Sequence, residues 1–284
     1  MAATAFQQQL CRLIATSRRG SGESYVAGGV ALNTLLQAPR ISRDIDLFHD
    51  TDEALRVSWE SDRTLLIQEE YGVQIVRQTP AYVEAAVSKG EERVIVQWLR
   101  ESAFRFFPLL EDERFGLVLH PFDLATNKIL ALAGRLEPRD WVDVLTTHEK
   151  LQPLGYLAWA ACGKDPGFSP ASLLAEASRT GRYTQAELDE LAFEGSPPDA
   201  RVLGAQWHRM LAEAQAIVEV LPPEQTGAAV LDRAGNLYRQ PPDALSADLQ
   251  DRAVFFHVGR IRGVWPAIAS LRQAPDLSIQ LPLA

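Results

Sequence analysis

Strand-like and helix-like patterns occupy different parts of this chain, and this division is the strongest constraint on its fold. Segments that alternate polar and apolar residues fall before residue 120, and from Phe122 onward the apolar residues recur mostly at helical spacing. We therefore predict an α/β (α+β) chain with a mixed sheet in an N-terminal lobe, residues 1–120. A mostly helical C-terminal lobe would follow at 121–284, and we expect an active site in the cleft between the lobes.

The expected elements follow from these patterns and from the glycine and proline residues that interrupt them. Strands are expected at 24–27, 44–49, 73–78, 81–87, 93–99 and 116–119, with a hairpin turn at 88–91. Helices are expected at 4–17, 30–36 and 51–70, and then at 122–134, 138–149, 154–161, 170–179, 184–192, 199–220 and 245–270. The turn-forming residues at 234–236 allow a further small hairpin.

Composition indicates an ordinary globular protein of the cytoplasm. Hydrophobic residues make up 46% of the chain and charged residues 23%. No apolar run approaches the ~20 residues of a membrane helix, so no membrane partner is expected, and the N-terminus lacks the pattern of a secretory signal. Only Cys11 and Cys162 are present, far apart, which fits a reducing compartment and offers neither a disulfide framework nor metal-ligand spacing.

The net charge of −9 argues against a broad nucleic-acid-binding surface. Residues 1–150 contain 17 basic and 22 acidic side chains, and the rest of the chain is acidic as well. Affinity for nucleic acid comes largely from neutralising phosphates, so an RNA partner would have to be held by a local basic patch.

Two short motifs near the N-terminus have the spacing of a nucleotide site. Gly28-Gly29 stands between a predicted strand and a predicted helix, where glycines let the backbone approach a ligand and the helix start offers N–H groups to phosphate. Asp44 and Asp46 follow on a predicted strand and point to the same face. Two carboxylates held this close favour a divalent cation between them, and Mg²⁺ (or Mn²⁺) accepts carboxylate and phosphate oxygens.

Each motif alone is weak, because paired glycines are more often a tight turn and Asp-x-Asp is common on solvated strands. Their order along strand, glycine corner, helix and strand makes the combination much more specific. Other catalytic arrangements have no support: the five histidines show no metal-ligand spacing, and neither a Gly-x-Ser-x-Gly motif nor a Walker-type loop is present.

A second pair of motifs lies at 123–135 (Asp-Leu-Ala-Thr-Asn-Lys-Ile-Leu-Ala-Leu-Ala-Gly-Arg) and 138–144 (Pro-Arg-Asp-Trp-Val-Asp-Val). Together with the run Gly-Gly-x-Ala-Leu and then Ser-x-Asp-x-Asp-Leu, they resemble the polymerase-β-like nucleotidyltransferase superfamily. Within it, the chain most resembles the AbiEii/AbiGii toxin family, which includes the MenT-type toxins. The resemblance covers about residues 24–146.

This resemblance implies a nucleotidyltransferase fold and a role for each matched residue. Asp44 and Asp46 would hold the metal, and Lys128 and Asp140 would act with them in catalysis. The residues implied to bind the nucleoside triphosphate (NTP) are Gly28, Gly29, Ser42, Lys128 and Arg135. Asp143 shares a helical face with Asp140 and is a further candidate; the alternative is that the two aspartates only form surface ion pairs.

One position departs from the pattern of the superfamily. Many nucleotidyltransferases have a third acidic residue on a neighbouring strand, available as a general base, but the natural place for it here holds Gln97. A neutral amide cannot accept the proton. Either Glu84 on the adjoining strand substitutes, or the metal site is less complete, or activity is lost.

Three functions remain open at this point. The resemblance implies transfer of a nucleoside monophosphate from an NTP to RNA, especially a tRNA 3′ end, by the toxin of a toxin–antitoxin system with a cognate antitoxin as partner. The same chemistry could act on a small molecule or on a protein hydroxyl. The third function is that of a non-catalytic module that binds a nucleotide or a partner. Gln97 is the best argument for it, because it stands where a general base is expected.

Overall fold

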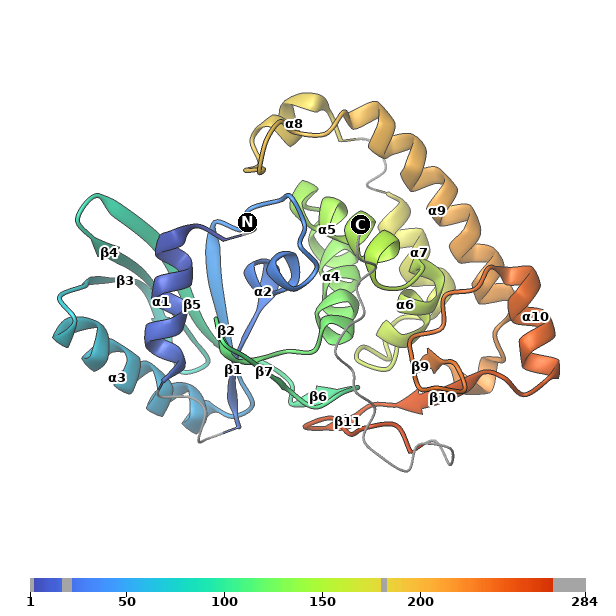
Figure 1. Ribbon diagram of the computed structural model, residues 1–284, viewed down its shortest axis with the longest axis horizontal. Helices are drawn as coiled ribbons and strands as arrows, with labels where there is room; N and C mark the ends of the chain where they lie inside the picture. Colours follow the sequence, from blue (N-terminus) through green and yellow to red (C-terminus); the bar gives the residue numbers. More distant parts are fainter. Residues whose placement is uncertain (1–2, 17–21, 180–182, 268–284) are drawn as a thin grey trace. The chain divides into compact units, whose positions relative to one another are not determined.

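The computed structural model describes residues 3–16, 22–179 and 183–267. The chain divides into two compact units, each with its own secondary structure (Figure 1). Unit 1 takes residues 1–103, 108–120 and 192–195, and unit 2 takes the remainder. The short segment 192–195 therefore belongs to unit 1, although the residues on both sides of it in the sequence belong to unit 2.

Unit 1 is built on a seven-stranded mixed sheet with the strand order β3-β4-β5-β2-β1-β8-β7 (Figure 1). Its strands are β1 (Ser24–Ala27), β2 (Asp44–His49), β3 (Gly72–Thr79), β4 (Tyr82–Lys89), β5 (Glu92–Arg100), β7 (Leu110–Asp112) and β8 (Gly116–Val118). Its helices are α1 (Ala5–Ala15), α2 (Gly28–Leu35) and α3 (Asp52–Gln68). At the centre, β2 runs antiparallel to β1 and parallel to β5.

Alternation along the strands gives the central sheet one buried face and one less buried face. On β2, Ile45 and Leu47 are fully buried while Asp44 and Asp46 keep some exposure. Helix α3 packs on the buried face, where the Trp59 ring meets Trp98 edge-on at a centroid distance of 4.7 Å. The opposite face of the central strands is the one that carries the aspartate pair.

Unit 2 is mostly helical. Its helices are α4 (Pro121–Arg135), α5 (Pro138–Lys150), α6 (Leu154–Ala161), α7 (Pro170–Ser178), α8 (Gln185–Asp189), α9 (Ala200–Val220), the 3₁₀ turn η1 (Pro223–Gln225) and α10 (Pro242–Gln250). Two small sheets complete it: β9 (Ala228–Leu231) with β10 (Phe255–Val258), and β6 (Phe104–Arg105) with β11 (Arg260–Ile261). A buried cluster that includes Tyr156, Trp159 and Ile217 forms part of its core.

The predicted class is confirmed: a mixed sheet occupies the first part of the chain and helices dominate the rest. The helix predicted at 245–270 is wrong. It ends at Gln250, Arg252 adopts φ 53°, and the chain continues as strands β10 and β11. The aromatic pair Phe255-Phe256 favours an extended strand, and β10 pairs antiparallel with β9, a partner far away in sequence. Residues 268–270 of that prediction lie outside the described residues.

Smaller differences concern short elements. Strands β6, β7 and β9 were not predicted, because they have four residues or fewer and are too short for a periodic signal. The helix predicted at 184–192 stops at Asp189, and α2 begins at Gly28, two residues earlier than predicted. Around 234–236 the chain does turn, with a single bridge between Leu231 and Leu237. Among the described residues, no helix is both long and apolar enough to cross a membrane.

Candidate functional site

The corner where β1 becomes α2 lies directly against the second aspartate of the Asp-x-Asp motif. Gly28 adopts φ 65°, a left-handed conformation that residues with a Cβ rarely adopt. A Cβ built on Gly28 would overlap the carboxylate of Asp46. Glycine is therefore required at this position for two reasons: the positive φ of the backbone, and the lack of space for a Cβ beside Asp46.

The second glycine of the corner is lined by the loop that leads into β2. A Cβ on Gly29 would lie 2.7 Å from Arg40 Nη2 and 2.8 Å from Ser42 Oγ. The Ser42 hydroxyl donates to Asp44 Oδ1 at 2.9 Å, and the buried Gln7 amide donates to the Ser42 carbonyl at 2.7 Å. Ser42 thus connects the glycine corner to the first aspartate.

The donor set at this corner suits a hard divalent cation that is completed by a substrate. Asp44 and Asp46 share one face of β2. In the described part of the chain, no group of three or more His, Cys, Asp and Glu side chains could hold a metal ion. Mg²⁺ is commonly held by one or two carboxylates together with phosphate oxygens and water, so a pair of carboxylates beside a phosphate-sized corner fits the ion with its nucleotide.

A row of polar side chains continues across the same face of the sheet. Asp46 is paired with Gln97 in the parallel β2–β5 ladder, and Gln97 is paired with Glu84 in the antiparallel β5–β4 ladder. The Tyr82 hydroxyl donates to Glu84 Oε2, and Gln97 Nε2 lies 3.5 Å from the same oxygen. Gln97, the position that departs from the superfamily pattern, therefore lies between Asp46 and Glu84.

Unit 2 contains a second group of candidate residues, joined by buried ion pairs. Lys128 Nζ, on α4, lies 2.9 Å from Asp140 Oδ1 and 3.0 Å from Asp143 Oδ2, both on α5. Arg135, at the end of α4, donates to both oxygens of Asp140, at 2.6 and 3.0 Å. Each helix supplies its pair from one face, and α4 and α5 pack against each other.

The aspartates of this group do not form surface ion pairs, so that alternative is wrong. Both Asp140 and Asp143 are fully buried, and the Lys128 side chain is 9% exposed. Burial by itself would raise the pKa of the Asp140 carboxyl, but Lys128 and Arg135 outweigh it and hold this pKa below its usual value. The two ion pairs fix the Lys128 side chain in position.

The structure thus brings the candidates together as two groups. Unit 1 holds Gly28, Gly29, Ser42, Asp44, Asp46, Glu84 and Gln97, and unit 2 holds Lys128, Arg135, Asp140 and Asp143. Sequence reasoning missed two residues of unit 1. Tyr82 could have been found as the same-face neighbour of Glu84 at i−2. Arg40 had no signal, because its approach to Gly29 depends on how the loop folds back.

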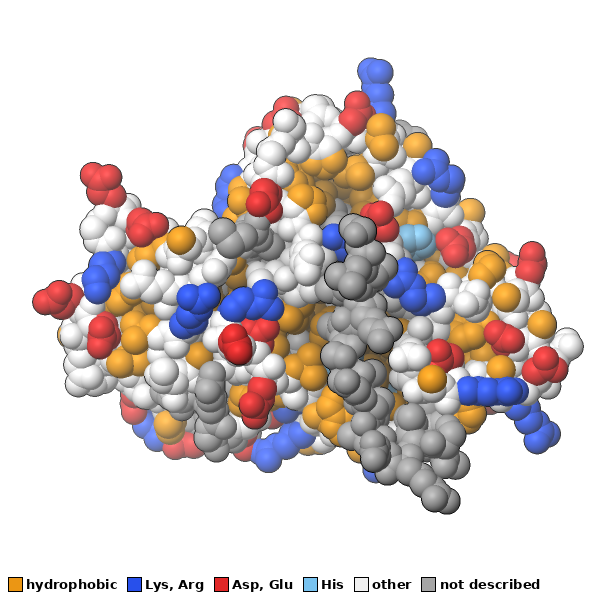
Figure 2. All heavy atoms as spheres, in the orientation of Figure 1, with side chains coloured by type: hydrophobic (Ala, Val, Ile, Leu, Met, Phe, Trp, Pro, Cys, Tyr) orange, Lys and Arg blue, Asp and Glu red, His pale blue; other side chains and the backbone are white. Residues whose placement is uncertain are grey.

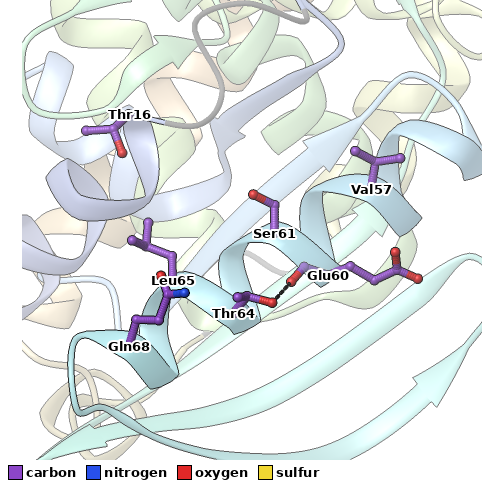
Figure 3. Close-up of a pocket in the computed structure, with 7 residues that line it drawn as sticks. All are labelled: Thr16, Val57, Glu60, Ser61, Thr64, Leu65 and Gln68. Atoms are coloured by element: carbon purple, nitrogen blue, oxygen red, sulfur yellow. Dashed lines mark hydrogen bonds between the residues drawn. The ribbon is translucent and has the colours of Figure 1, made fainter.

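A separate hollow of about 570 Å³ lies beside α3 in unit 1 (Figure 3). It is lined by Thr16, Val57, Glu60, Ser61, Thr64, Leu65 and Gln68. Glu60 is the one titratable side chain in this lining, and Figure 3 shows the Thr64 hydroxyl bonded to the backbone of the helix rather than to a polar partner across the hollow. Paired acid–base or metal-ligating groups are absent from these lining residues.

Comparison with known proteins gives structural neighbours only. No family model matches the chain, and no curated protein matches it in sequence. A protein from H. pylori assigned as a nucleotidyltransferase has a TM-score of 0.48 at 14% identity, over 75% of this chain and 95% of the other. MenT4, a nucleotidyltransferase toxin of Mycobacterium tuberculosis, has a TM-score of 0.48 at 16% identity, over 77% and 83%.

Proposed function

We propose that this protein is a divalent-metal-dependent nucleotidyltransferase, which moves a nucleoside monophosphate from an NTP to an acceptor hydroxyl and releases pyrophosphate. The observation that carries the proposal is the fit of Gly28 against Asp46. A left-handed glycine opens a helix directly beside one of two carboxylates on a shared strand face. A phosphate at the start of α2 would then lie next to the pair of carboxylates that can share its metal ion.

Each group of residues has a task in this reaction. The N–H groups at the start of α2 and the Ser42 hydroxyl would bind phosphate oxygens at the glycine corner. Asp44 and Asp46 would hold the Mg²⁺ ion, which supplies orientation of the triphosphate and neutralises charge that develops during in-line attack. The motif resemblance implies that Lys128 and Arg135 bind the triphosphate. Ion pairs with Asp140 and Asp143 fix Lys128, and hydrogen bonds to Asp140 fix Arg135.

For the acceptor we propose RNA, with a tRNA 3′ end as the first candidate and a role as the toxin of a toxin–antitoxin pair. The support for this is the motif resemblance over residues 24–146. Figure 2 shows basic side chains interspersed with acidic ones over the visible face, without a broad area of either sign among the residues it colours. RNA binding would then rest on local contacts, and its salt dependence would scale with the number of phosphates that they neutralise.

The test incubates the purified protein with each α-labelled NTP, Mg²⁺ and total tRNA. Asp46→Asn and Asp44→Asn serve as the site variants, because each removes one charge at nearly constant volume. Asp52→Asn is the matched control, since Asp52 is a 60% exposed carboxylate in the same unit that pairs with the 54% exposed Arg100. We expect label on RNA with the wild type and Asp52→Asn, and at least a 100-fold lower rate with either site variant.

The outcomes separate the three functions. Label on a protein or small molecule in a cell extract, with none on RNA, would keep the chemistry and replace the acceptor. Nucleotide binding without any label transfer would indicate the non-catalytic module. Full transfer by Asp46→Asn would show that the metal assignment is wrong.

A further inference from the structure

The glutamate next to Gln97 occupies a position suited to the proton transfer that the reaction requires. We infer that Glu84 is the general base that accepts the proton of the attacking hydroxyl, and that Tyr82 positions it. This inference rests on the proposed function and assigns a residue to the step for which Gln97 has no capacity.

The first support is register. Asp46, Gln97 and Glu84 lie opposite one another on three adjacent strands, so their side chains emerge from the same face in one row. Neighbouring strands are about 4.8 Å apart, which places Glu84 two strand spacings from Asp46. By this register, a hydroxyl that attacks a phosphate held beside Asp46 would lie over Gln97, between the metal-binding carboxylates and Glu84.

The second support is the way in which Glu84 is held. Tyr82, two residues earlier on β4, donates its hydroxyl to Glu84 Oε2, and the Gln97 amide nitrogen lies 3.5 Å from that oxygen. Burial raises the pKa of the Tyr82 hydroxyl above its ordinary value, and the hydrogen bond to Glu84 and the charges of Glu84 and Asp46 raise it further. Tyr82 therefore stays a donor and orients the carboxylate.

The third support concerns the other carboxylate oxygen. Within the described residues, both polar contacts of the Glu84 carboxylate fall on Oε2. Glu84 is half-buried, so water can carry away a proton that it has accepted. Oε1 can thus receive the proton of a bound hydroxyl while Tyr82 keeps the side chain in place.

Distance from the aspartates argues for a base rather than a third metal ligand. Two strand spacings separate Glu84 from Asp46, and among the described residues no group of three or more His, Cys, Asp and Glu side chains is placed to hold a metal ion. A general base has to reach only the attacking hydroxyl, which lies on the acceptor side of the reacting phosphate.

The proposed step balances without any further reactant. The hydroxyl proton moves to Glu84 Oε1 as the acceptor oxygen forms a bond to the α-phosphorus of the NTP. The bond from that phosphorus to the bridging oxygen breaks, and pyrophosphate leaves with the electron pair. Glu84 then releases its proton to water.

The experiment measures the rate of label transfer from pH 6 to 9 for the wild type, Glu84→Gln, Tyr82→Phe and the double variant Glu84→Gln/Gln97→Glu. Glu92→Gln on β5 is the control, because Glu92 is an exposed carboxylate at the far end of the strand. Affinity for NTP with Mn²⁺ is measured on the same proteins by calorimetry, which reports the nucleotide and metal site without catalysis.

We expect Glu84→Gln to lower the rate about 100- to 10,000-fold, the usual contribution of a general base, with nucleotide affinity changed less than threefold. Its residual rate should rise about tenfold per pH unit, because hydroxide replaces the missing base. Tyr82→Phe should lose about 3- to 10-fold, in line with one lost hydrogen bond. The double variant should regain at least tenfold over Glu84→Gln, because the new carboxylate stands one strand nearer to Asp46.

Other results would overturn the inference in distinguishable ways. Transfer by Glu84→Gln at the wild-type rate would exclude Glu84 as the base. A large loss of affinity for NTP and Mn²⁺ in Glu84→Gln would make it a metal ligand instead. If the wild type itself transferred no label, the proposed function would fail and the assignment of Glu84 would fail with it.

Discussion

Two constraints act on Gly28 at the glycine corner: its left-handed backbone conformation and the lack of space for a side chain. Substitutions can separate the two. Gly28 and Gly90 have nearly the same positive φ, 65° and 63°. The space around Gly90 is open, whereas a Cβ at Gly28 meets the Asp46 carboxylate. The left-handed conformation costs a residue with a side chain about 1–2 kcal/mol at either position.

We therefore predict different outcomes for the same substitution at the two glycines. Gly90→Ala should lower the free energy of unfolding by about 1–2 kcal/mol and leave label transfer unchanged. Gly28→Ala should also displace Asp46 and reduce transfer by at least 100-fold. Urea unfolding and the transfer assay on both variants provide the measurement. Equal activity of the two would show that the contact with Asp46 has no role in the reaction.

At the scale of elements, helices α4 and α5 hold the candidate residues of unit 2 in a network of ion pairs. Two buried aspartates on α5 face Lys128 on α4, so each charge depends on the others for solvation. Arg135 belongs to the same network, but its side chain is 48% exposed. If Arg135 is removed, water can reach its place and solvate Asp140. If Lys128 is removed, the buried aspartates lose a partner that water cannot replace.

Substitution of the two cations by methionine should reflect this difference. Lys128→Met leaves two buried carboxylates short of a partner and should cost about 3–5 kcal/mol in the free energy of unfolding. Arg135→Met should cost about 1 kcal/mol or less. Denaturant unfolding followed by circular dichroism measures both. A Lys128→Met protein as stable as Arg135→Met would contradict the buried network.

Helix α5 also contains a group that makes stability depend on pH. His148 Nδ1 accepts the backbone N–H of Leu154 at 3.1 Å, at the start of α6. Burial, together with the charge of Arg239, lowers the pKa of His148 from 6.5 to about 4. The unfolded chain thus binds more protons than the folded protein between these values, so stability is retained above pH 6.5 and lost as the pH falls toward 4.

We expect the free energy of unfolding to drop by on the order of 2 kcal/mol between pH 7 and pH 4 through this residue. His148→Asn keeps an acceptor for Leu154 without titrating, so this part of the pH dependence should disappear. His208→Asn, at an exposed position on α9, is the control and should keep the wild-type slope. A wild-type slope in His148→Asn would contradict the assignment.

The local elements were largely predictable, and the contacts between distant segments were not. The alternation of polar and apolar residues predicted strand β2 with Asp44 and Asp46 on one face, because side chains in a strand repeat their direction every two residues. Helical spacing placed Lys128 and Arg135 on one face of α4 for the same kind of reason. The contact of Tyr82 with Glu84 needed only the same rule. Arg40 beside Gly29, and the pairing of β9 with β10, depend on how loops return, which no local pattern encodes.

At the scale of the whole molecule, a late segment of the chain completes the first unit. Residues 192–195 lie beside the loop before β2: Ile41 N–H donates to the Ala192 carbonyl at 2.8 Å, and Glu194 N–H donates to the Pro39 carbonyl at 2.7 Å. Arg40 and Phe193 form an antiparallel bridge between these two bonds. The loop that carries Arg40 and Ser42 to the glycine corner is therefore held by residues far along the sequence.

Removal of one of these backbone donors should weaken the corner. Glu194→Pro lacks the N–H that Pro39 accepts and should lower the free energy of unfolding by about 1–3 kcal/mol, with weaker binding of NTP. Glu194→Ala is the matched control, because it removes the side chain and keeps the N–H. Thermal unfolding and nucleotide titration compare the two. Identical behaviour would mean that the segment does not support the corner.

The central claim is that Asp44 and Asp46 share a divalent ion with a nucleotide at the glycine corner. A crystal structure with Mn²⁺ and an NTP analogue that cannot be cleaved at the α-phosphorus tests it most directly, because Mn²⁺ gives an anomalous signal. We predict an anomalous peak about 2 Å from a carboxylate oxygen of each aspartate, with phosphate oxygens against the start of α2. Bound nucleotide whose metal contacts neither aspartate would contradict the account.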